Sequence, residues 1–315
     1  MDTFGLTTQL NYTVCFPLLG KWLEVRSNHA DVLHAAERTF GHWLALPADE
    51  ITTQEQLRVD VLATDDAPNQ SSPTDWPFKQ RVHGHTFVAT LGQDILTAQL
   101  DRGYAIAFVS AALAANTTYL QKQVLDTLGL LITTQRDREP IHAGAVAWQG
   151  KALLLAGKSK VGKSTLCYAC AQAGFALLAE DVIYIQRQPR LRVWGHSQCV
   201  HLLADAPRFF PELRNVPVQR LPNGKAKLAA AVAHTRRFAE QCALCIIERW
   251  PQAHSEVQPL QRDDALTALF AGLDEGFHLY PRAREAAEEL LTHNPCYTLR
   301  VGHDLDRAVE LLKTL

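Results

Sequence analysis

The chain has 315 residues, of which 47% are hydrophobic and 20% are charged. These proportions are ordinary for folded globular proteins and argue against disorder, while the length favours two domains. The 31 basic and 33 acidic residues give a net charge of -2. No overall charge excess therefore draws the chain to nucleic acid or to an anionic membrane.

The amino-terminal segment lacks the marks of an export signal. Asp2 lies in it, no Lys or Arg precedes Lys21, and no run of 18 apolar residues occurs anywhere in the chain. We therefore expect neither a secretory signal nor a transmembrane helix. Seven cysteines, an odd number without an export signal, favour reduced thiols. The expectation is a cytoplasmic protein that binds no membrane.

Residues 1–135 are expected to form a small α+β domain. Alternating and helical spacings, together with turn-forming residues, mark its elements. In chain order they are a strand at 21–27, a helix from an N-cap at Asn28 to about 46, a strand at 55–63, a loop at 69–76, three or four strands between 79 and 110 with turns near Gly84, Gly92 and Gly103, and a helix at 117–131.

Residues 136–315 are expected to form an α/β domain. It opens with two strands joined at Gln149-Gly150, and the second of them ends in the apolar run at 152–156. A glycine- and lysine-rich turn and a helix follow. The later elements are strands near 193–201 and 242–247, helices near 264–273 and 281–293, a strand at 297–301 and a helix at 305–315. Buried strands mixed with helices indicate an α/β core.

The turn matches the P-loop pattern of Gly, four residues, Gly, Lys and then Ser or Thr. Its residues are Gly157, Lys158, Ser159, Lys160, Val161, Gly162, Lys163 and Ser164, and the helix begins at Thr165. Because a strand precedes the pattern and a helix follows it, we predict that the loop amides bind the phosphates of ATP. Lys163 would reach the β- and γ-phosphates, and Ser164 would bind Mg²⁺.

Two parts of this interpretation have alternatives. The pattern as a whole could be a fortuitous turn that contains glycine and lysine. Lys158 and Lys160 either add positive charge over the triphosphate or are solvated loop lysines.

An acidic doublet follows the predicted P-loop helix. Glu180 and Asp181 interrupt the otherwise apolar segment FALLAEDVIYI. Two adjacent acids are costly to bury without a partner, and a metal ion is one such partner. We predict that Glu180 and Asp181, with Ser164, hold Mg²⁺ and activate the acceptor; a charged turn between two strands is the alternative.

His142 lies just before the strand pair that leads into the loop. The sheet could place it beside the phosphates or Asp181, where it could orient a carboxylate or an acceptor hydroxyl. Spacing alone carries little weight for this role, because most of the 13 histidines are expected to lie at the surface or in packing.

These motifs together resemble the catalytic domain of bacterial HPr kinase/phosphorylase and its kinase-like relatives, which share a nucleotide fold with phosphoenolpyruvate carboxykinases. The resemblance covers residues 141–315 and is strongest over 141–185. It implies a P-loop kinase domain in which His142, Glu180 and Asp181 form the catalytic cluster, with Asp181 as the base. The relatives commonly carry Asp-Asp where this chain has Glu180-Asp181. The resemblance also implies homo-oligomers.

Two further segments share this resemblance. LPNGKAKL looks like a Gly-Lys turn of the relatives, which makes Lys225 a candidate for phosphate contact and Lys227 the weaker one. CIIERW resembles a strand ending in Glu-Arg, where Arg249 could equally be a structural ion-pair residue. The signature that serves HPr and the phosphorylase reaction is absent after the acidic doublet, and residues 1–135 do not resemble the usual N-terminal domain.

Zinc is a weaker interpretation of the two Cys-x-x-Cys pairs. Cys167 and Cys170 lie on the predicted P-loop helix, and Cys242 and Cys245 lie in an apolar strand. Neither setting favours tetrahedral closure, so we interpret these thiols as small buried residues. Likewise, the basic segment at 234–238 is expected to be solvated rather than to bind nucleic acid.

The sequence thus predicts an ATP- and Mg²⁺-dependent kinase that phosphorylates a hydroxyl of a protein, a peptide or a small molecule, with residues 1–135 recognising the acceptor. The alternative is a nucleotide-binding regulatory or peptide-binding module without transferase activity. An ATPase motor fits less well, because no arginine finger paired with a water-positioning residue stands out.

Overall fold

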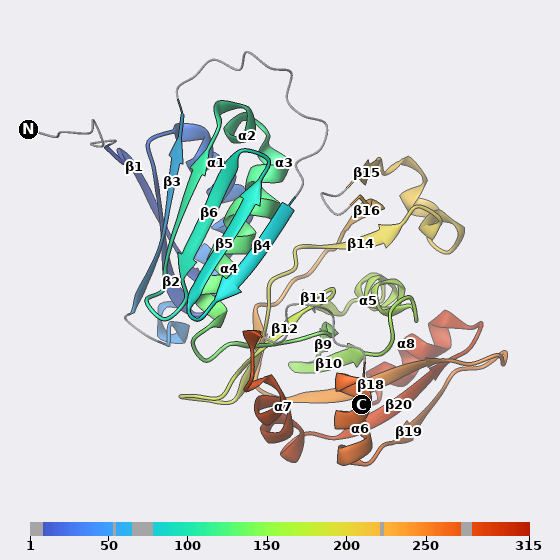
Figure 1. The fold of residues 1–315 in the computed structure, drawn as a ribbon. Helices are drawn as coiled ribbons and strands as arrows, with labels where there is room; N and C mark the ends of the chain where they lie inside the picture. Colours follow the sequence, from blue (N-terminus) through green and yellow to red (C-terminus); the bar gives the residue numbers. More distant parts are fainter. Residues whose placement is uncertain (1–8, 53–54, 65–77, 221–223, 272–278) are drawn as a thin grey trace, which may run out of the picture. The chain divides into compact units, whose positions relative to one another are not determined.

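The computed structural model describes residues 9–52, 55–64, 78–220, 224–271 and 279–315. The chain divides into two compact units, Met1–Arg136 and Asp137–Leu315, and has a mixed α/β fold with several sheets (Figure 1). Within the described ranges, no helix has both the length and the apolar character needed to cross a membrane. The expected loop at 69–76 lies outside the described residues.

The first unit contains a seven-stranded sheet with the order β1-β2-β3-β7-β6-β5-β4. Its strands are β1 (Tyr12–Leu18), β2 (Lys21–Ser27), β3 (Gln56–Ala63), β4 (Phe78–His83), β5 (Thr86–Leu91), β6 (Asp94–Gln99) and β7 (Tyr104–Val109). Its helical segments are α1 (Ala30–Phe40), η1 (Gly41–Ala45), η2 (Ala48–Glu50), α2 (Ala111–Ala115), α3 (Thr117–Tyr119), η3 (Leu120–Asp126) and α4 (Thr127–Thr134). The pairs β2–β3 and β3–β7 are parallel, and the other neighbours are antiparallel.

The alternating patterns of this unit predict its strands well. The strand expected at 21–27 is β2, and four strands with positive-φ glycines at their turns occupy 78–109. The predicted N-cap was wrong, because His29 caps α1. The Asn28 side chain instead donates a hydrogen bond to the carbonyl oxygen of Ala63 and accepts one from its backbone N–H. These two bonds join the start of α1 to the end of β3. The strand β1 was not predicted.

The second unit is built on a six-stranded sheet with the order β11-β9-β10-β18-β20-β19. These strands are β9 (Gly144–Trp148), β10 (Lys151–Ala156), β11 (Ala176–Ala179), β18 (Cys242–Arg249), β19 (Glu256–Pro259) and β20 (Cys296–Val301). β10 is parallel to β18, and β18 is parallel to β20. β10 and β11 both run antiparallel to β9, so they are parallel to each other.

Helices cover both faces of this sheet. The helices of this unit are α5 (Lys163–Gln172), α6 (Arg262–Phe270), α7 (Ala283–Thr292) and α8 (Leu305–Lys313). Ala152 and Leu154 of β10 face a core shared with α6 and α7. Leu153 and Leu155 face a second core shared with α5 and α8. This burial on both sides explains why β10 is a continuous apolar run rather than an alternating one.

Two smaller sheets complete this unit. One contains β8 (Glu139–Ile141), β12 (Ile183–Gln186), β13 (Arg192–Gly195) and β17 (Phe238–Ala239), and the other contains β14 (Cys199–Leu203), β15 (Val218–Arg220) and β16 (Ala226–Ala231). The short 3-10 turns η4 (Ala206–Arg208) and η5 (Pro211–Asn215) follow β14. The single strand expected near 193–201 is therefore two strands, β13 and β14, in different sheets. Residues 196–198, with a bend at Gln198, separate them.

Candidate functional site

The loop between β10 and α5 needs glycine at both ends of the predicted pattern. Gly157 has φ 149°, and a Cβ there would lie 2.8 Å from the carbonyl oxygen of Ile247. Gly162 has φ 113° and is the N-cap of α5. Because Gly162 has no side chain to cap the helix, an anion at this end could take the capping role. Lys160 also has a positive φ, 65°.

Lys163 begins α5, and its side chain folds back over the loop. The ammonium Nζ donates to the carbonyl oxygen of Gly157 at 2.9 Å and lies 3.5 Å from that of Lys158. Only 7% of Lys163 is exposed. The next residues, Ser164 and Thr165, are half-buried in the first turn of α5. By contrast, Lys158, Ser159 and Lys160 are exposed, and Val161 is half-buried.

The sheet topology brings His142, Glu180 and Asp181 to the same edge as this loop. Parallel β10, β11 and β18 end there, so the loop, the doublet Glu180-Asp181 and the end of β18 at Arg249 share one edge. β9 runs the opposite way and begins there, just after His142. Ligand sites in α/β sheets typically lie beyond the carboxyl ends of the strands.

Two side-chain contacts join other parts of this edge. Arg249 donates from its guanidinium to the carbonyl oxygen of Lys160 at 2.9 Å, which attaches the end of β18 to the loop. Cys167, one turn after Lys163, approaches the carbonyl oxygen of Ala179 at 4.0 Å. The pKa of Cys167 is raised to about 12, mainly by burial and also by the negative charges of Glu180 and Asp181, while Lys163 acts in the opposite direction. The pKa of this thiol is thus affected by the charges of Lys163 and of both acids.

The two acids of the doublet have different partners. Both carboxylate oxygens of Glu180 accept hydrogen bonds from His201: Nδ1 lies 2.8 Å from Oε1, and the backbone N–H donates to Oε2. The backbone N–H of Glu180 donates to Ser197 Oγ at 2.9 Å. Asp181 instead lies 3.5 Å from Nε2 of His142, and 59% of its side chain is exposed.

Burial and hydrogen bonding act in opposite directions on Glu180. Burial would raise its pKa, but the hydrogen bonds and the positive charge of His201 outweigh burial, and the pKa is lowered. Hydrogen bonds with Cys199 and with Glu180 raise the pKa of His201 to about 10. Glu180 is therefore a carboxylate held in place by an imidazolium.

Sequence reasoning missed His201 and Ser197. They lie 21 and 17 residues after Glu180, His201 on β14 and Ser197 in the segment between β13 and β14. The only available signal was the position of His201 on a strand that alternates between buried and half-exposed residues, and that pattern also fits an ordinary surface histidine.

The two lysines of the predicted Gly-Lys turn lie in different surroundings. Lys225 is exposed and lies just before β16, whereas Lys227 lies within β16. The positive charge of Lys227 contributes to lowering the pKa of Glu180. It is thus Lys227, the weaker candidate from sequence, whose charge acts on the doublet. The preceding residues of that turn, 221–223, lie outside the described residues.

The oxygen donors at this edge fit Mg²⁺ better than a softer metal. The Ser164 hydroxyl and the Asp181 carboxylate are the kind of ligand that Mg²⁺ prefers, usually together with phosphate oxygens and water. No group of three or more His, Cys, Asp or Glu side chains that could hold a metal occurs in the parts of the chain that the structure describes. The thiols of Cys167, Cys170, Cys242 and Cys245 are free and buried.

Comparison with solved structures finds a likeness to the HPr(Ser) kinase/phosphatase from Coxiella burnetii. The two chains are 14% identical, the alignment covers 56% of this chain and 87% of that chain, and the TM-score is 0.30. No protein-family model and no curated protein matches the sequence. Functional inference therefore rests on the contacts within this chain.

Proposed function

We propose that this chain is an ATP- and Mg²⁺-dependent phosphotransferase that moves the γ-phosphoryl group to a hydroxyl of a protein, a peptide or a small molecule. The observation that carries the proposal is the shared sheet edge. The glycine loop with Lys163 follows β10, and the doublet with Asp181 follows the parallel strand β11. Phosphoryl transfer needs little more than a phosphate cradle, a metal and an oriented acceptor.

Each residue has a role that follows from its surroundings. The loop amides and the N-terminus of α5 would bind the phosphates. Lys163 would exchange the carbonyl oxygen of Gly157 for phosphate oxygens, since an ammonium group prefers an anionic acceptor. Ser164 would contribute a hydroxyl ligand to Mg²⁺, which neutralises the developing charge on the phosphates.

Asp181 is the acid available to the acceptor. Its exposed carboxylate can accept the proton of an incoming hydroxyl, and His142 at 3.5 Å can orient it. Glu180 has a different role in this proposal, because both of its oxygens already accept hydrogen bonds from His201. It positions the end of β11 against β14. The first unit, with two sheet edges at β1 and β4, is proposed to recognise the acceptor.

Radiolabelled ATP tests the proposal directly. The purified chain would be incubated with γ-labelled MgATP and a cell extract, and Lys163→Ala compared with the wild type. Lys313→Ala is the matched control: Lys313 lies over the ring of Trp148, at the far end of β9 from the loop. Labelled product should form with the wild type and the control, and fall at least about 100-fold with Lys163→Ala.

The outcomes separate the two functional classes. Equal labelling by the wild type and Lys163→Ala would contradict a phosphotransferase acting at this loop. Saturable binding of MgATP that depends on Lys163, with no labelled product from any extract or peptide pool, would favour a nucleotide-dependent binding module instead.

A further inference from the structure

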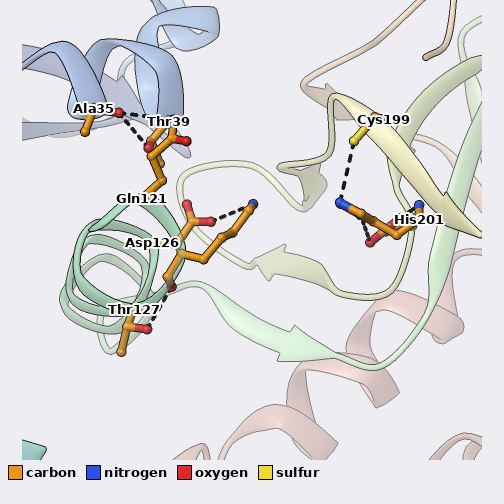
Figure 2. A network of polar contacts seen from close by, with 9 residues as sticks. Ala35, Thr39, Gln121, Asp126, Thr127, Cys199 and His201 are labelled. Atoms are coloured by element: carbon orange, nitrogen blue, oxygen red, sulfur yellow. Dashed lines mark hydrogen bonds and ion pairs between the residues drawn. The ribbon is translucent and has the colours of Figure 1, made fainter. Parts of the chain in front are cut away.

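A cysteine, a histidine and a glutamate form a connected row beside the proposed nucleotide site. Cys199 and His201 are two residues apart on β14, so their side chains lie on the same face of that strand. Sγ of Cys199 lies 3.9 Å from Nε2 of His201, as the dashed line in Figure 2 shows. On the other side of the ring, Nδ1 of His201 lies 2.8 Å from Oε1 of Glu180.

This order of groups is the one that activates a thiol. A carboxylate on Nδ1 fixes the orientation of the ring and leaves Nε2 directed at the sulfur. A positively charged imidazole beside a thiol favours the thiolate, which is the reactive form. Glu180, which follows β11, and Lys227 of β16 are charged groups that act on this cluster.

The other six cysteines lack these surroundings. Cys167, Cys170, Cys242, Cys245 and Cys296 are buried, and burial raises the pKa of each thiol. Cys15 is half-buried like Cys199, but burial and the negative charge of Glu24 raise its pKa. Cys15 is therefore a natural control within the same chain.

We infer that Cys199 is a nucleophilic thiol activated by His201, and that it is a site of covalent oxidation by hydrogen peroxide or another small peroxide. The thiolate attacks one peroxide oxygen, an S–O bond forms and the O–O bond breaks. The sulfur is oxidised by two electrons to a sulfenic acid, and the peroxide is reduced to hydroxide, which takes the proton from His201 to give water. No nucleotide takes part, so the inference stands apart from phosphoryl transfer.

Alkylation of the intact chain with iodoacetamide tests the nucleophile. Peptide mass spectrometry would give separate rates for Cys199 and Cys15 between pH 6 and pH 8. At pH 6.5 Cys199 should react at least about tenfold faster than Cys15. The Cys199 rate should change by less than about threefold over this range, while the Cys15 rate rises about tenfold per pH unit. Parallel pH profiles for the two thiols would overturn the inference.

Two variants sharpen the result. His201→Gln should give Cys199 the steep pH profile of Cys15; if that variant does not fold, the wild-type profiles alone still decide. Treatment with hydrogen peroxide followed by dimedone should add the sulfenic-acid label at Cys199 in the wild type, and Cys199→Ser should lose it. Fast alkylation without any dimedone adduct at Cys199 would overturn the assignment of a peroxide as its reactant.

Discussion

The buried side and the open side of the acidic doublet differ in how their carboxylates are held. On the buried side, Glu180 is 19% exposed and is held by the side chain and backbone of His201. On the open side, Asp181 is 59% exposed and has the imidazole of His142 at 3.5 Å. Consecutive residues beyond one strand thus have separate physical roles: a fixed carboxylate contributes to stability, and a solvent-facing one is available for chemistry.

The largest effect should come from Asp181→Asn. If Asp181 receives the proton of the acceptor, the amide should lower phosphoryl transfer about 10²- to 10³-fold, because it keeps the shape of the side chain but not its basicity. Asp263→Asn, at an exposed aspartate on α6, is the control. Rates of product formation and a direct MgATP-binding assay would be measured together. Unchanged turnover in Asp181→Asn would contradict the role of Asp181 as the group that receives the proton of the acceptor.

Glu180→Gln should act mainly on stability. The substitution leaves His201 facing a neutral amide, and a buried hydrogen bond to a charged group contributes about 1.5–3 kcal/mol. The free energy of unfolding, from urea titration, should therefore fall by roughly that amount. Glu288→Gln, at a 49% exposed residue that pairs with Arg284, should change it by less than about 0.5 kcal/mol. Equal effects of the two substitutions would contradict the contrast between a held and a free carboxylate.

The sequence alone predicted one part of this contrast and not the other. The glycines, Lys163 and the doublet are local in the chain, and the apolar run of β10 and the turn at Gln149-Gly150 place them on one edge. The partner of Glu180 could not be predicted, because His201 reaches it through a separate sheet. From sequence, Glu180 and Asp181 were both predicted to hold Mg²⁺, with Asp181 as the base by resemblance, and the structure adds the different partner of each acid.

The same limit explains the errors in the fold. The strand patterns of β2, β5, β6 and β7 were clear because buried and more exposed residues alternate along them. The segment 193–201 was misread as one strand, since its sequence does not show that β13 ends at Gly195 and that β14 begins at Cys199 in another sheet. Asn28 was predicted as the N-cap because asparagine favours that position. Its side chain is instead engaged in two hydrogen bonds with the backbone of Ala63.

The pH dependence of stability should follow the Glu180–His201 pair. The lowered pKa of Glu180 means that its contribution is present above the unfolded value of 4.5 and is lost as the pH falls through the folded value. The raised pKa of His201 means that its contribution is full below 6.5 and is lost as the pH rises through about 10. The pair should therefore stabilise most between about pH 5 and 6.5.

Urea titrations of the wild type and His201→Gln at pH 6 and pH 10 would measure this dependence. The difference between the two proteins should shrink by roughly 1–2 kcal/mol at pH 10, because the wild type then loses the charged hydrogen bond that the variant already lacks. A constant difference across this range would show that His201 acts through its shape and not its charge.

The smallest effect should come from His142→Ala. Its pair with Asp181 is half open to solvent, and such pairs contribute about 0–1 kcal/mol to stability, so the free energy of unfolding should barely change. If His142 orients the Asp181 carboxylate, turnover should still fall about 3- to 10-fold. The double variant His142→Ala/Asp181→Asn should then be no slower than Asp181→Asn alone, since the histidine acts through the carboxylate. If the losses of turnover in the two single variants add up in the double variant, His142 contacts the acceptor separately. His142 and Asp181 would then act independently of each other.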